Sequence, residues 1–389
     1  MKIYIDVSMI MIGTKFTGIP RVTMELAKRF YERKFDLIFI EYDVNKDKYR
    51  VIDTKGFIGF CRDKKGSRNK LRTDSLIEFD GFEKDAVFFD VDTVWKTRVR
   101  RSFLYPKLKE KGVKIIPFIH DIIGIDYPQF CQTDDVMNFA DYIGAALNFA
   151  DRIAVNSNAT EDSIKELAKR LKTKEPVTDV ALLGGDFKKK TSEDSEDNGS
   201  ISDIAKKIVE SGRYIYMVGT LEPRKNHKLL LDAYEEILHE SINLVIVGFA
   251  GQGMEDLIAR IENNPNYQRG LWYLNGANDE ELDYLYKHSF ALTFPSYAEG
   301  YGLPLMEAMI RRVPIIASDT PINREVAKDR ALYFEKDDWK EFSDIVLNLL
   351  NDEKAYIDLC GKTKDYVPPT WEDTASDVIK TFEAVYRGQ

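Results

Sequence analysis

The feature that most constrains this chain is an alternation of apolar runs with amphipathic helical patterns, which occurs twice along its length. In the first half, short apolar runs are separated by segments whose apolar residues recur every few positions, as Val22, Leu26 and Phe30 do. Such an alternation predicts an α/β fold with a parallel sheet covered on both faces. We expect strands at 3–10, 36–42, 86–90, 114–121 and 152–157, and helices at 20–33, 138–150 and 160–171, the last one capped by Thr160.

The alternation breaks near residue 187, where the segment 188–200 is polar and charged. Such a segment cannot bury a core and predicts a linker or a long exposed loop. Strands are then expected at 214–220, 243–249, 271–276, 290–296 and 314–318, with helices at 226–238, 254–263, 279–289, 303–312 and 339–350. The 389 residues therefore divide into a domain over 1–190, a polar linker over 191–204, a domain over 205–370 and a C-terminal helix over 371–389, whose packing partner stays open.

Composition excludes several classes of protein. The net charge of −9 argues against nucleic acid as a partner, because dedicated nucleic-acid binders are basic. Cys61, Cys131 and Cys360 lie far apart, which predicts neither a zinc site nor a disulfide framework and fits a reducing compartment. The N-terminus reads as a strand rather than a signal peptide, and no run approaches the roughly 18 apolar residues of a membrane span. We therefore expect a cytoplasmic protein.

The most informative segment is 290–318, which reads as a strand, a glycine-rich turn, a helix and a further strand. Glu299 falls in the turn beyond the first strand, and Glu307 falls one turn into the helix that Pro304 opens. Ligands of open α/β sheets bind in that crevice. Backbone N–H groups of the turn and the helix start suit a diphosphate, and carboxylates beside them suit ribose or sugar hydroxyls. The alternative is a structural turn with carboxylates at a helix start.

Four segments of the chain together match the motifs of one family. Residues 299–307 read E-G-Y-G-L-P-L-M-E, residues 18–21 read G-I-P-R, residues 120–121 read H-D, and residues 218–226 read V-G-T-L-E-P-R-K-N. They resemble, in that order, the E-x7-E motif, the N-terminal glycine loop, the His-Asp pair and the first C-terminal-domain loop of retaining glycosyltransferases of the family-4 type (glycosyl transferases group 1). The resemblance spans about residues 1–385 and extends to bacterial surface-polysaccharide mannosyltransferases. It implies the GT-B fold, with two Rossmann-like doubly wound domains facing a central cleft, the first binding the acceptor and the second the nucleotide sugar.

The resemblance also implies roles for the matched residues. Glu299 would bind donor-sugar hydroxyls, Glu307 would hold the ribose, and Lys225 would neutralise charge on the departing diphosphate. Many relatives carry an arginine where this chain has Thr220, and Arg224 would supply the second cation. The implied catalytic residues are Glu299, Lys225, His120 and Asp121, and the implied donor-binding residues are Gly18, Arg21, Thr220, Arg224, Lys225, Gly300, Tyr301, Gly302, Leu303 and Glu307.

Two of these assignments have structural alternatives. Arg224 and Lys225 could form a solvated turn at a helix start, although positive charge there is mildly unfavourable unless an anion binds. His120 could be a hydrogen-bonded structural group; otherwise it contacts the sugar or aligns the acceptor, with Asp121 orienting its imidazole or acting as the base. The remaining histidines fall in helical patterns and are expected to be structural: His227, His239 and His288.

Charge is unevenly distributed within the first domain. Residues 45–72 contain ten Lys or Arg against three Asp, and residues 95–101 add four cations. One reading is a solvated loop. The other is attraction to an anionic membrane surface or a lipid-diphosphate acceptor, peripheral on the inner face of the membrane. Exposure of the apolar residues at 57–60 would support the second reading.

The motifs predict retaining, metal-independent transfer of a hexosyl group from a nucleotide-diphosphate sugar, without a cofactor. The favoured donor is GDP-mannose, with UDP-hexose and dTDP-rhamnose as alternatives, and the expected acceptor is a glycan or lipid-linked glycan of bacterial surface polysaccharide. The only Asp-x-Asp triplet, Asp90-Val91-Asp92, reads as a strand end rather than a metal site. The alternatives are a GT-B sugar-nucleotide epimerase and an inactive sugar-nucleotide-binding module. A nicotinamide-dependent dehydrogenase is disfavoured, because neither Gly219 nor Gly248 opens a G-x-G-x-x-G motif.

Overall fold

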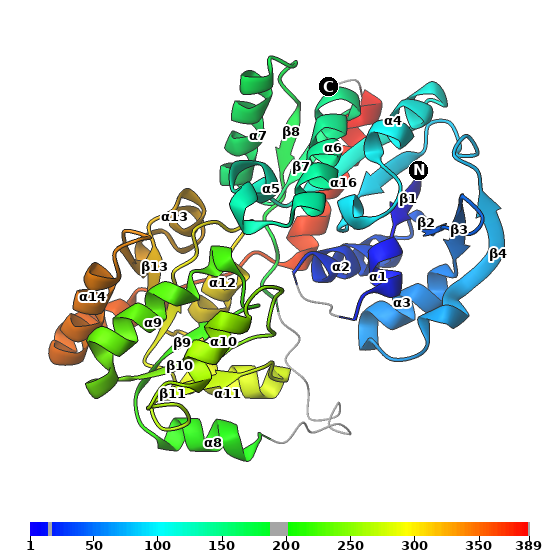
Figure 1. Ribbon diagram of the computed structural model, residues 1–389. Coiled ribbons are helices and arrows are strands. Elements are labelled where there is room, and N and C mark those ends of the chain that lie inside the picture. Colours follow the sequence, from blue (N-terminus) through cyan, green and yellow to red (C-terminus); the bar gives the residue numbers. More distant parts are fainter. Residues whose placement is uncertain (15–17, 187–200, 388–389) are drawn as a thin grey trace. The chain divides into compact units, whose positions relative to one another are not determined.

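The chain folds into two compact units, each built around its own sheet (Figure 1). The computed structural model describes residues 1–14, 18–186 and 201–387. The first unit comprises Met1–Gly184 with Pro369–Gln389, and the second comprises Gly185–Pro368. Most of the predicted linker over 191–204 lies outside the described residues. Its last part does not form a linker, because helix α8 (Asp203–Glu210) begins there, capped by the Ser202 side chain.

The first unit contains a sheet of eight strands in the order β4-β3-β2-β1-β5-β6-β7-β8. Strands β2, β1, β5, β6, β7 and β8 pair in parallel, which confirms the predicted parallel sheet, although the strand at β8 was not predicted. Their bounds are β1 Lys2–Asp6, β2 Asp36–Asp43, β5 Val87–Asp90, β6 Lys114–Ile119, β7 Ile153–Val155 and β8 Thr178–Val180, and the accompanying helices are α1 Ser8–Ile12, α2 Ile19–Glu32, α4 Arg101–Glu110, α5 Ile123–Asp126, α6 Thr133–Phe149 and α7 Asn158–Leu171.

Two local predictions for this unit are wrong. The strand expected over 3–10 ends at Asp6, because the Asp6 carboxylate accepts the Ser8 amide and turns the chain into α1. Helix α7 is capped by Ser157, whose hydroxyl accepts the Thr160 amide, rather than by Thr160 itself. In both places a short polar side chain bonds to nearby backbone and fixes where the element ends.

The basic segment 45–72 is not a solvated loop. It forms β3 (Lys48–Ile52), α3 (Thr54–Asp63) and the 3-10 turn η1 (Arg68–Leu71), which leads into β4 (Arg72–Ile77). Strands β3 and β4 add to the sheet antiparallel, so this sheet is mixed rather than purely parallel. The apolar residues 57, 58 and 60 are buried, so they are not available to insert into a membrane. The sequence did not indicate these helices and strands, because cations alternate with the buried apolar residues along the segment.

Arg101 was counted among the surface cations, and that reading is wrong. Its guanidinium is 1% exposed and bonds to Asp90 (Nε–Oδ2 2.6 Å) and to Asp6 (Nη2–Oδ2 2.8 Å). The Tyr105 hydroxyl donates to Asp90 as well, at 2.8 Å. Asp90 ends β5, as expected of the Asp-x-Asp triplet, and its carboxylate is engaged by this arginine. A sequence pattern within one helix cannot indicate the ion pairs of Arg101, because Asp6 and Asp90 belong to two strands.

The second unit contains six parallel strands in the order β11-β10-β9-β12-β13-β14. The parallel, doubly wound arrangement predicted for this half is confirmed. Its strands are β9 Tyr214–Val218, β10 Asn243–Val247, β11 Leu271–Leu274, β12 Ala291–Phe294, β13 Ile315–Ser318 and β14 Ala331–Phe334, and its helices beyond α8 are α9 His227–Glu236, α10 Glu255–Glu262, α11 Asp279–His288, α12 Leu303–Ile310, α13 Pro321–Ala327, α14 Trp339–Asn351 and α15 Glu353–Gly361. The chain order reverses between β9 and β12, which is where doubly wound sheets bind ligands.

The C-terminal helix α16 (Trp371–Arg387) belongs to the first unit, which answers the question that the sequence left open. The Phe382 ring lies 5.5 Å from Phe30 of α2 and 5.0 Å from Phe89 of β5, centroid to centroid. Trp371 is buried at the start of the helix, and Glu372 pairs with Arg33. No helix in the described part of the chain has the length and apolar character needed to cross a membrane.

Candidate functional site

The turn between β12 and α12 is shaped by its glycines. Gly302 adopts φ 91°, a left-handed conformation that favours glycine, and immediately precedes α12. Leu303 and Pro304 then open the helix, and no side chain caps this N-terminus. The first amides of a helix lack intrahelical acceptors and carry partial positive charge, so the turn is suited to an anion. Gly300 and Tyr301 lie in the same turn, with Tyr301 buried.

Glu299 lies in this turn and contacts the two cations that follow β9. The Lys225 ammonium bonds to Glu299 Oε1 at 2.5 Å, and Arg224 Nη1 bonds to Oε2 at 2.8 Å and to the Ala298 carbonyl at 3.1 Å. The Tyr297 amide donates to the Arg224 carbonyl at 2.8 Å, so backbone joins the two loops as well. The structure thus orients Arg224 toward the Glu299 turn and excludes the alternative of a solvated turn for this pair.

The opposite charges in this cluster stabilise one another's ionised forms. Burial by itself would raise the pKa of Glu299, but Arg224 and Lys225 outweigh it and lower that pKa to about 2. Burial lowers the pKa of the Lys225 ammonium, and the Glu299 carboxylate opposes that shift. The Lys225 and Glu299 side chains are each 8% exposed. Arg224 also pairs with Glu222, whose Oε2 lies 2.9 Å from Nε, so the two cations are matched by two carboxylates, and a phosphate would have to take the place of a carboxylate beside them.

Glu307 lies in the second turn of α12 and meets a side chain that the sequence did not single out. The Tyr286 hydroxyl, from α11, lies 3.2 Å from Glu307 Oε2 and 3.4 Å from the Pro304 carbonyl. The Arg311 guanidinium stands 4.9 Å from the centre of the Tyr286 ring and bonds to Asp283. Tyr286 was missed because its apolar spacing in α11 reads as ordinary core, and only the folded chain shows its hydroxyl beside the carboxylate.

Thr220 lies in the loop that follows β9, which meets the loop that follows β10. Gly219, directly before it, adopts φ 143°, and a Cβ there would lie 3.7 Å from the Lys225 ammonium. A Cβ on Gly248 would come within 1.8 Å of the Gly219 carbonyl oxygen, so glycine is required there for the loops to meet. Thr220, where many relatives are expected to carry arginine, thus directly follows the glycine that the Lys225 ammonium approaches.

The other candidate residues belong to the first unit. Gly18 precedes α2 with φ 63°, and its carbonyl accepts the Arg21 amide at 3.0 Å. His120 follows β6 and is buried, and its Nε2 donates to the Val91 carbonyl at 2.8 Å. That bond leaves Nδ1 as the acceptor nitrogen of a neutral ring. The Asp121 carboxylate accepts the Ile123 amide at 2.9 Å, while a carbonyl of the Asp90-Val91-Asp92 segment orients the imidazole.

The state of His120 predicts a pH dependence of stability. Burial lowers the pKa of His120 from 6.5 to about 4, so the unfolded chain binds this proton first as the pH falls. The neutral ring makes its full contribution to the free energy of unfolding above pH 6.5. Between pH 6.5 and 4 the free energy of unfolding should fall by about 1.4 kcal/mol per pH unit. Urea unfolding of wild type and His120→Asn across this range should show a flatter profile for the variant. His239→Asn, at an exposed position, should keep the wild-type profile, and parallel profiles for wild type and His120→Asn would contradict the assignment.

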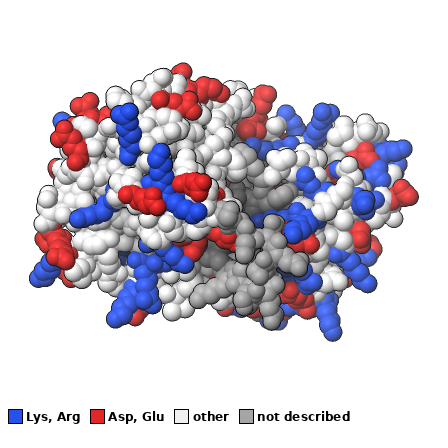
Figure 2. Space-filling view, turned by 90° about the horizontal axis from the view of Figure 1, so that it is seen from below, with Lys and Arg blue, Asp and Glu red and all other residues white. Residues whose placement is uncertain are grey.

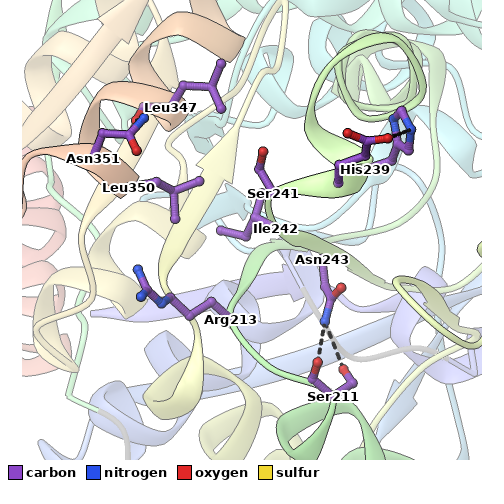
Figure 3. Close-up of a pocket in the computed structure, with 10 residues that line it drawn as sticks. Ser211, Arg213, His239, Ser241, Ile242, Asn243, Leu347, Leu350 and Asn351 are labelled. Carbon is purple, nitrogen blue, oxygen red and sulfur yellow. Dashed lines mark hydrogen bonds and ion pairs between the residues drawn. The ribbon is translucent and has the colours of Figure 1, made fainter.

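A pocket of about 430 Å³ lies elsewhere in the second unit (Figure 3). Arg213 and Asn243 line it where β9 and β10 begin, and the Asn243 amide donates to the Ser211 carbonyl and hydroxyl at 3.1 and 3.0 Å. Leu347 and Leu350 of α14 form an apolar side. Parallel strands begin at one edge of a sheet and end at the other, so this pocket is at the edge opposite the Glu299 turn. It contains none of the predicted site residues.

Comparisons with known proteins agree with the geometry of the second unit. Residues 200–365 match the family model described as glycosyl transferases group 1. The serotype-specific mannosyltransferase WbdA of Escherichia coli is 31% identical over 265 residues, which are 64% of this chain and 32% of that protein. The O-antigen chain mannosyltransferase RfbU of Salmonella typhimurium is 32% identical over 144 residues, 36% of this chain and 39% of that protein. The chain thus spans about a third of the length of the WbdA proteins that it matches.

Solved structures show the fold of the whole chain. Anabaena Alr3699/HepE, solved in complex with UDP and glucose, superposes with a TM-score of 0.67 at 15% identity, covering 99% of this chain and all of that one. Sucrose-phosphate synthase from Thermosynechococcus elongatus gives 0.65 at 14% identity over the full length of both chains. The chain therefore has the GT-B fold. The similarity to the glycosyl transferases group 1 family lies in the second unit, over residues 200–365.

Proposed function

We propose that this protein catalyses retaining, metal-independent transfer of a hexosyl group from a nucleotide-diphosphate sugar to a glycan or lipid-linked glycan acceptor. The single observation that carries the proposal is the cluster in which Arg224 and Lys225 meet Glu299 beside the uncapped start of α12. A diphosphate that binds there would draw the two cations away from Glu299. That carboxylate would then be available to sugar hydroxyls, so the site would bind both the diphosphate and the sugar of the donor.

The proposed chemistry places positive side chains where a metal ion would otherwise act. Charge growing on the departing diphosphate would be met by Lys225, Arg224 and the amides of Gly302 and Leu303. In the same-face mechanism that we favour, the leaving phosphate helps to take the acceptor's proton, so the C–O bond to the acceptor forms as the bond to the diphosphate breaks. His120, with Nδ1 as an acceptor, would contact the sugar or align the acceptor in the first unit.

GDP-mannose is the donor that we favour, because several relatives of the chain bear the name mannosyltransferase. Those names also favour an acceptor in bacterial surface polysaccharide. UDP-hexose and dTDP-rhamnose are the competing donors. A sugar-nucleotide epimerase and an inactive binding module are the competing functions: the first would isomerise a donor supplied alone, and the second would bind a donor but transfer to no acceptor.

The test is a thermal-shift panel of UDP, GDP, dTDP and their hexose conjugates. A ligand that binds only the folded protein raises its melting temperature by mass action, by an amount that grows with the ratio of concentration to Kd. We expect one nucleotide series to raise the melting temperature of the second unit, with GDP and GDP-mannose strongest. Absence of a shift with every nucleotide at millimolar concentration would overturn the proposal.

Removal of the lysine ammonium should weaken both binding and transfer. Lys225→Met deletes one of two cations at the diphosphate position, so we expect nucleoside diphosphate affinity and kcat/KM each to fall by about a hundredfold. Titration calorimetry and initial rates measure the two effects. Lys228→Met is the matched control: that lysine is 74% exposed three residues away, pairs with Asp232, and should leave both quantities near wild type. Equal affinities for Lys225→Met and wild type would contradict the role.

We further propose that exposed lysines of the first unit attract the protein to an anionic membrane surface, with localisation on the cytoplasmic face. Four lysines of α3, η1 and the turn between them are exposed and form no salt bridge with another described residue: Lys55, Lys64, Lys65 and Lys70. Figure 2 shows Lys and Arg side chains, mixed with Asp and Glu, over the right-hand part of the view. Because residues 57–60 are largely buried or lack an apolar side chain, the attraction would be electrostatic.

Lipid vesicles test this attraction. Each lysine near an anionic surface contributes about 1 kcal/mol, so Lys64→Ser/Lys65→Ser/Lys70→Ser should lower the vesicle partition coefficient by roughly a hundredfold at low salt. Sedimentation with phosphatidylglycerol-containing vesicles measures it, and pure phosphatidylcholine vesicles should bind neither protein. Salt should weaken wild-type binding, because it screens exposed charges. Binding that is insensitive to both salt and lipid charge would exclude an electrostatic surface.

A further inference from the structure

We propose that Phe249 is the stacking platform for the base of the nucleotide, in a subsite formed by the loops that follow β10 and β11. The inference rests on the proposed function and goes beyond it, because it assigns a binding role to a residue outside every motif of the sequence. The ligand class is a heteroaromatic base attached to the ribose of a nucleoside diphosphate.

Phe249 lies in the loop after β10, beside the loop that carries Lys225. It follows the carboxyl end of β10, and its side chain is 43% exposed. Its carbonyl accepts the Leu221 amide at 2.9 Å, and the Gly251 amide donates to the Leu221 carbonyl at 2.9 Å. Leu221 belongs to the loop that carries Lys225. A large apolar side chain therefore stands on a loop whose backbone is hydrogen-bonded to the loop that carries Lys225.

The neighbouring loop makes room for the ring and limits its position. A Cβ on Gly276 would come within 2.7 Å of Phe249 Cε1, and Gly276 adopts φ 94°, so glycine is required here both for space and for conformation. The Asn275 side-chain oxygen accepts the Ala250 amide at 3.4 Å and ties the two loops together. The ring is thus seated against the backbone of the β11 loop while much of its surface stays accessible.

The course of a bound nucleotide would bring its base to this ring. Strands β10 and β12 flank β9 on opposite sides, and Glu299, assigned to the sugar, follows β12. Glu307, assigned to the ribose, contacts Tyr286 of α11. Helix α11 begins directly after the loop that contains Gly276, so a base extending from that ribose along α11 reaches the Phe249 side of the sheet. Stacking on an aromatic ring accepts every base, since each has a π face.

The experiment compares a ligand that has a base with one that lacks it. Titration calorimetry with the preferred nucleoside diphosphate and with inorganic pyrophosphate is performed on wild type, Phe249→Leu and Phe249→Trp. Base stacking amounts to about 1–3 kcal/mol, so Phe249→Leu should bind the nucleoside diphosphate roughly tenfold to a hundredfold more weakly. Its pyrophosphate affinity should equal that of wild type, and Phe249→Trp should retain nucleotide affinity. Phe103→Leu, an exposed phenylalanine of the first unit, is the matched control and should change neither ligand's affinity.

Three outcomes would overturn the assignment, and they can be told apart. Unchanged nucleotide affinity in Phe249→Leu would remove the platform and leave the proposed function intact. Equal losses for pyrophosphate and nucleotide would show a disturbed cation loop instead of a base contact. If wild type binds no nucleoside diphosphate at all, the proposed function fails, and the base subsite fails with it.

Discussion

Glu299→Gln should lower kcat by about a thousandfold, the size of effect seen when a charged or hydrogen-bonding group acting on the transition state is lost. The amide keeps the shape of the side chain but cannot accept hydrogen bonds from sugar hydroxyls at both positions. Nucleoside diphosphate affinity should be preserved or should rise, because the Glu299 carboxylate no longer competes with phosphate for Lys225 and Arg224. Steady-state rates and titration calorimetry separate the two effects.

The same substitution should also change stability in a ligand-dependent way. In the free protein it leaves the Lys225 ammonium, 8% exposed, without its anionic partner, which is strongly destabilising for a buried charge. A bound diphosphate restores an anion, so the melting temperature of Glu299→Gln should rise more with ligand than that of wild type. Glu222→Gln is the matched control, since Glu222 also pairs with Arg224 but is 37% exposed, and it should keep most of the activity. Wild-type turnover in Glu299→Gln would remove Glu299 from the mechanism.

Arg101→Leu should destabilise the first unit by about 3–5 kcal/mol. The substitution leaves Asp6 and Asp90, both fully buried, without their shared cation, and uncompensated buried charge carries a cost of this size. Burial raises the pKa of Asp90 while Arg101 opposes the shift, so loss of the arginine should drive that carboxyl toward its protonated form. Urea unfolding followed by circular dichroism measures the loss. Raising the pH through the shifted pKa should enlarge it, because the buried acid must then ionise.

The control for this prediction is its immediate neighbour. Arg100 is exposed, and Arg100→Leu should change the free energy of unfolding by no more than about 0.5 kcal/mol. The nucleotide-induced rise in the melting temperature of the second unit should be unaffected by either change. Equal stabilities for Arg100→Leu and Arg101→Leu would contradict the buried network.

The candidate site could be predicted from sequence to the extent that its residues are local. Glu299 lies in the turn and Glu307 in the helix that follows it, so their spacing along the chain already placed both near the end of one strand. Arg224 and Lys225 were identified as cations, but their direction was not, because it depends on bonds to Ala298 and Glu299 across 74 and 75 positions of sequence. Spacing within one segment carries no information about such a contact.

The sequence by itself determined the doubly wound α/β class, the parallel character of most strand pairs and the location of the Glu299 turn, because hydrophobic periodicity and glycine placement act over a few residues. Only the tertiary structure decided that α3 and two antiparallel strands occupy the basic segment, that Arg101 is buried, and that α16 joins the first unit. It also placed Phe249 against Gly276 and Tyr286 against Glu307. The physical reason is the same throughout: burial and charge pairing are set by partners distant in sequence, and only the folded chain brings them together.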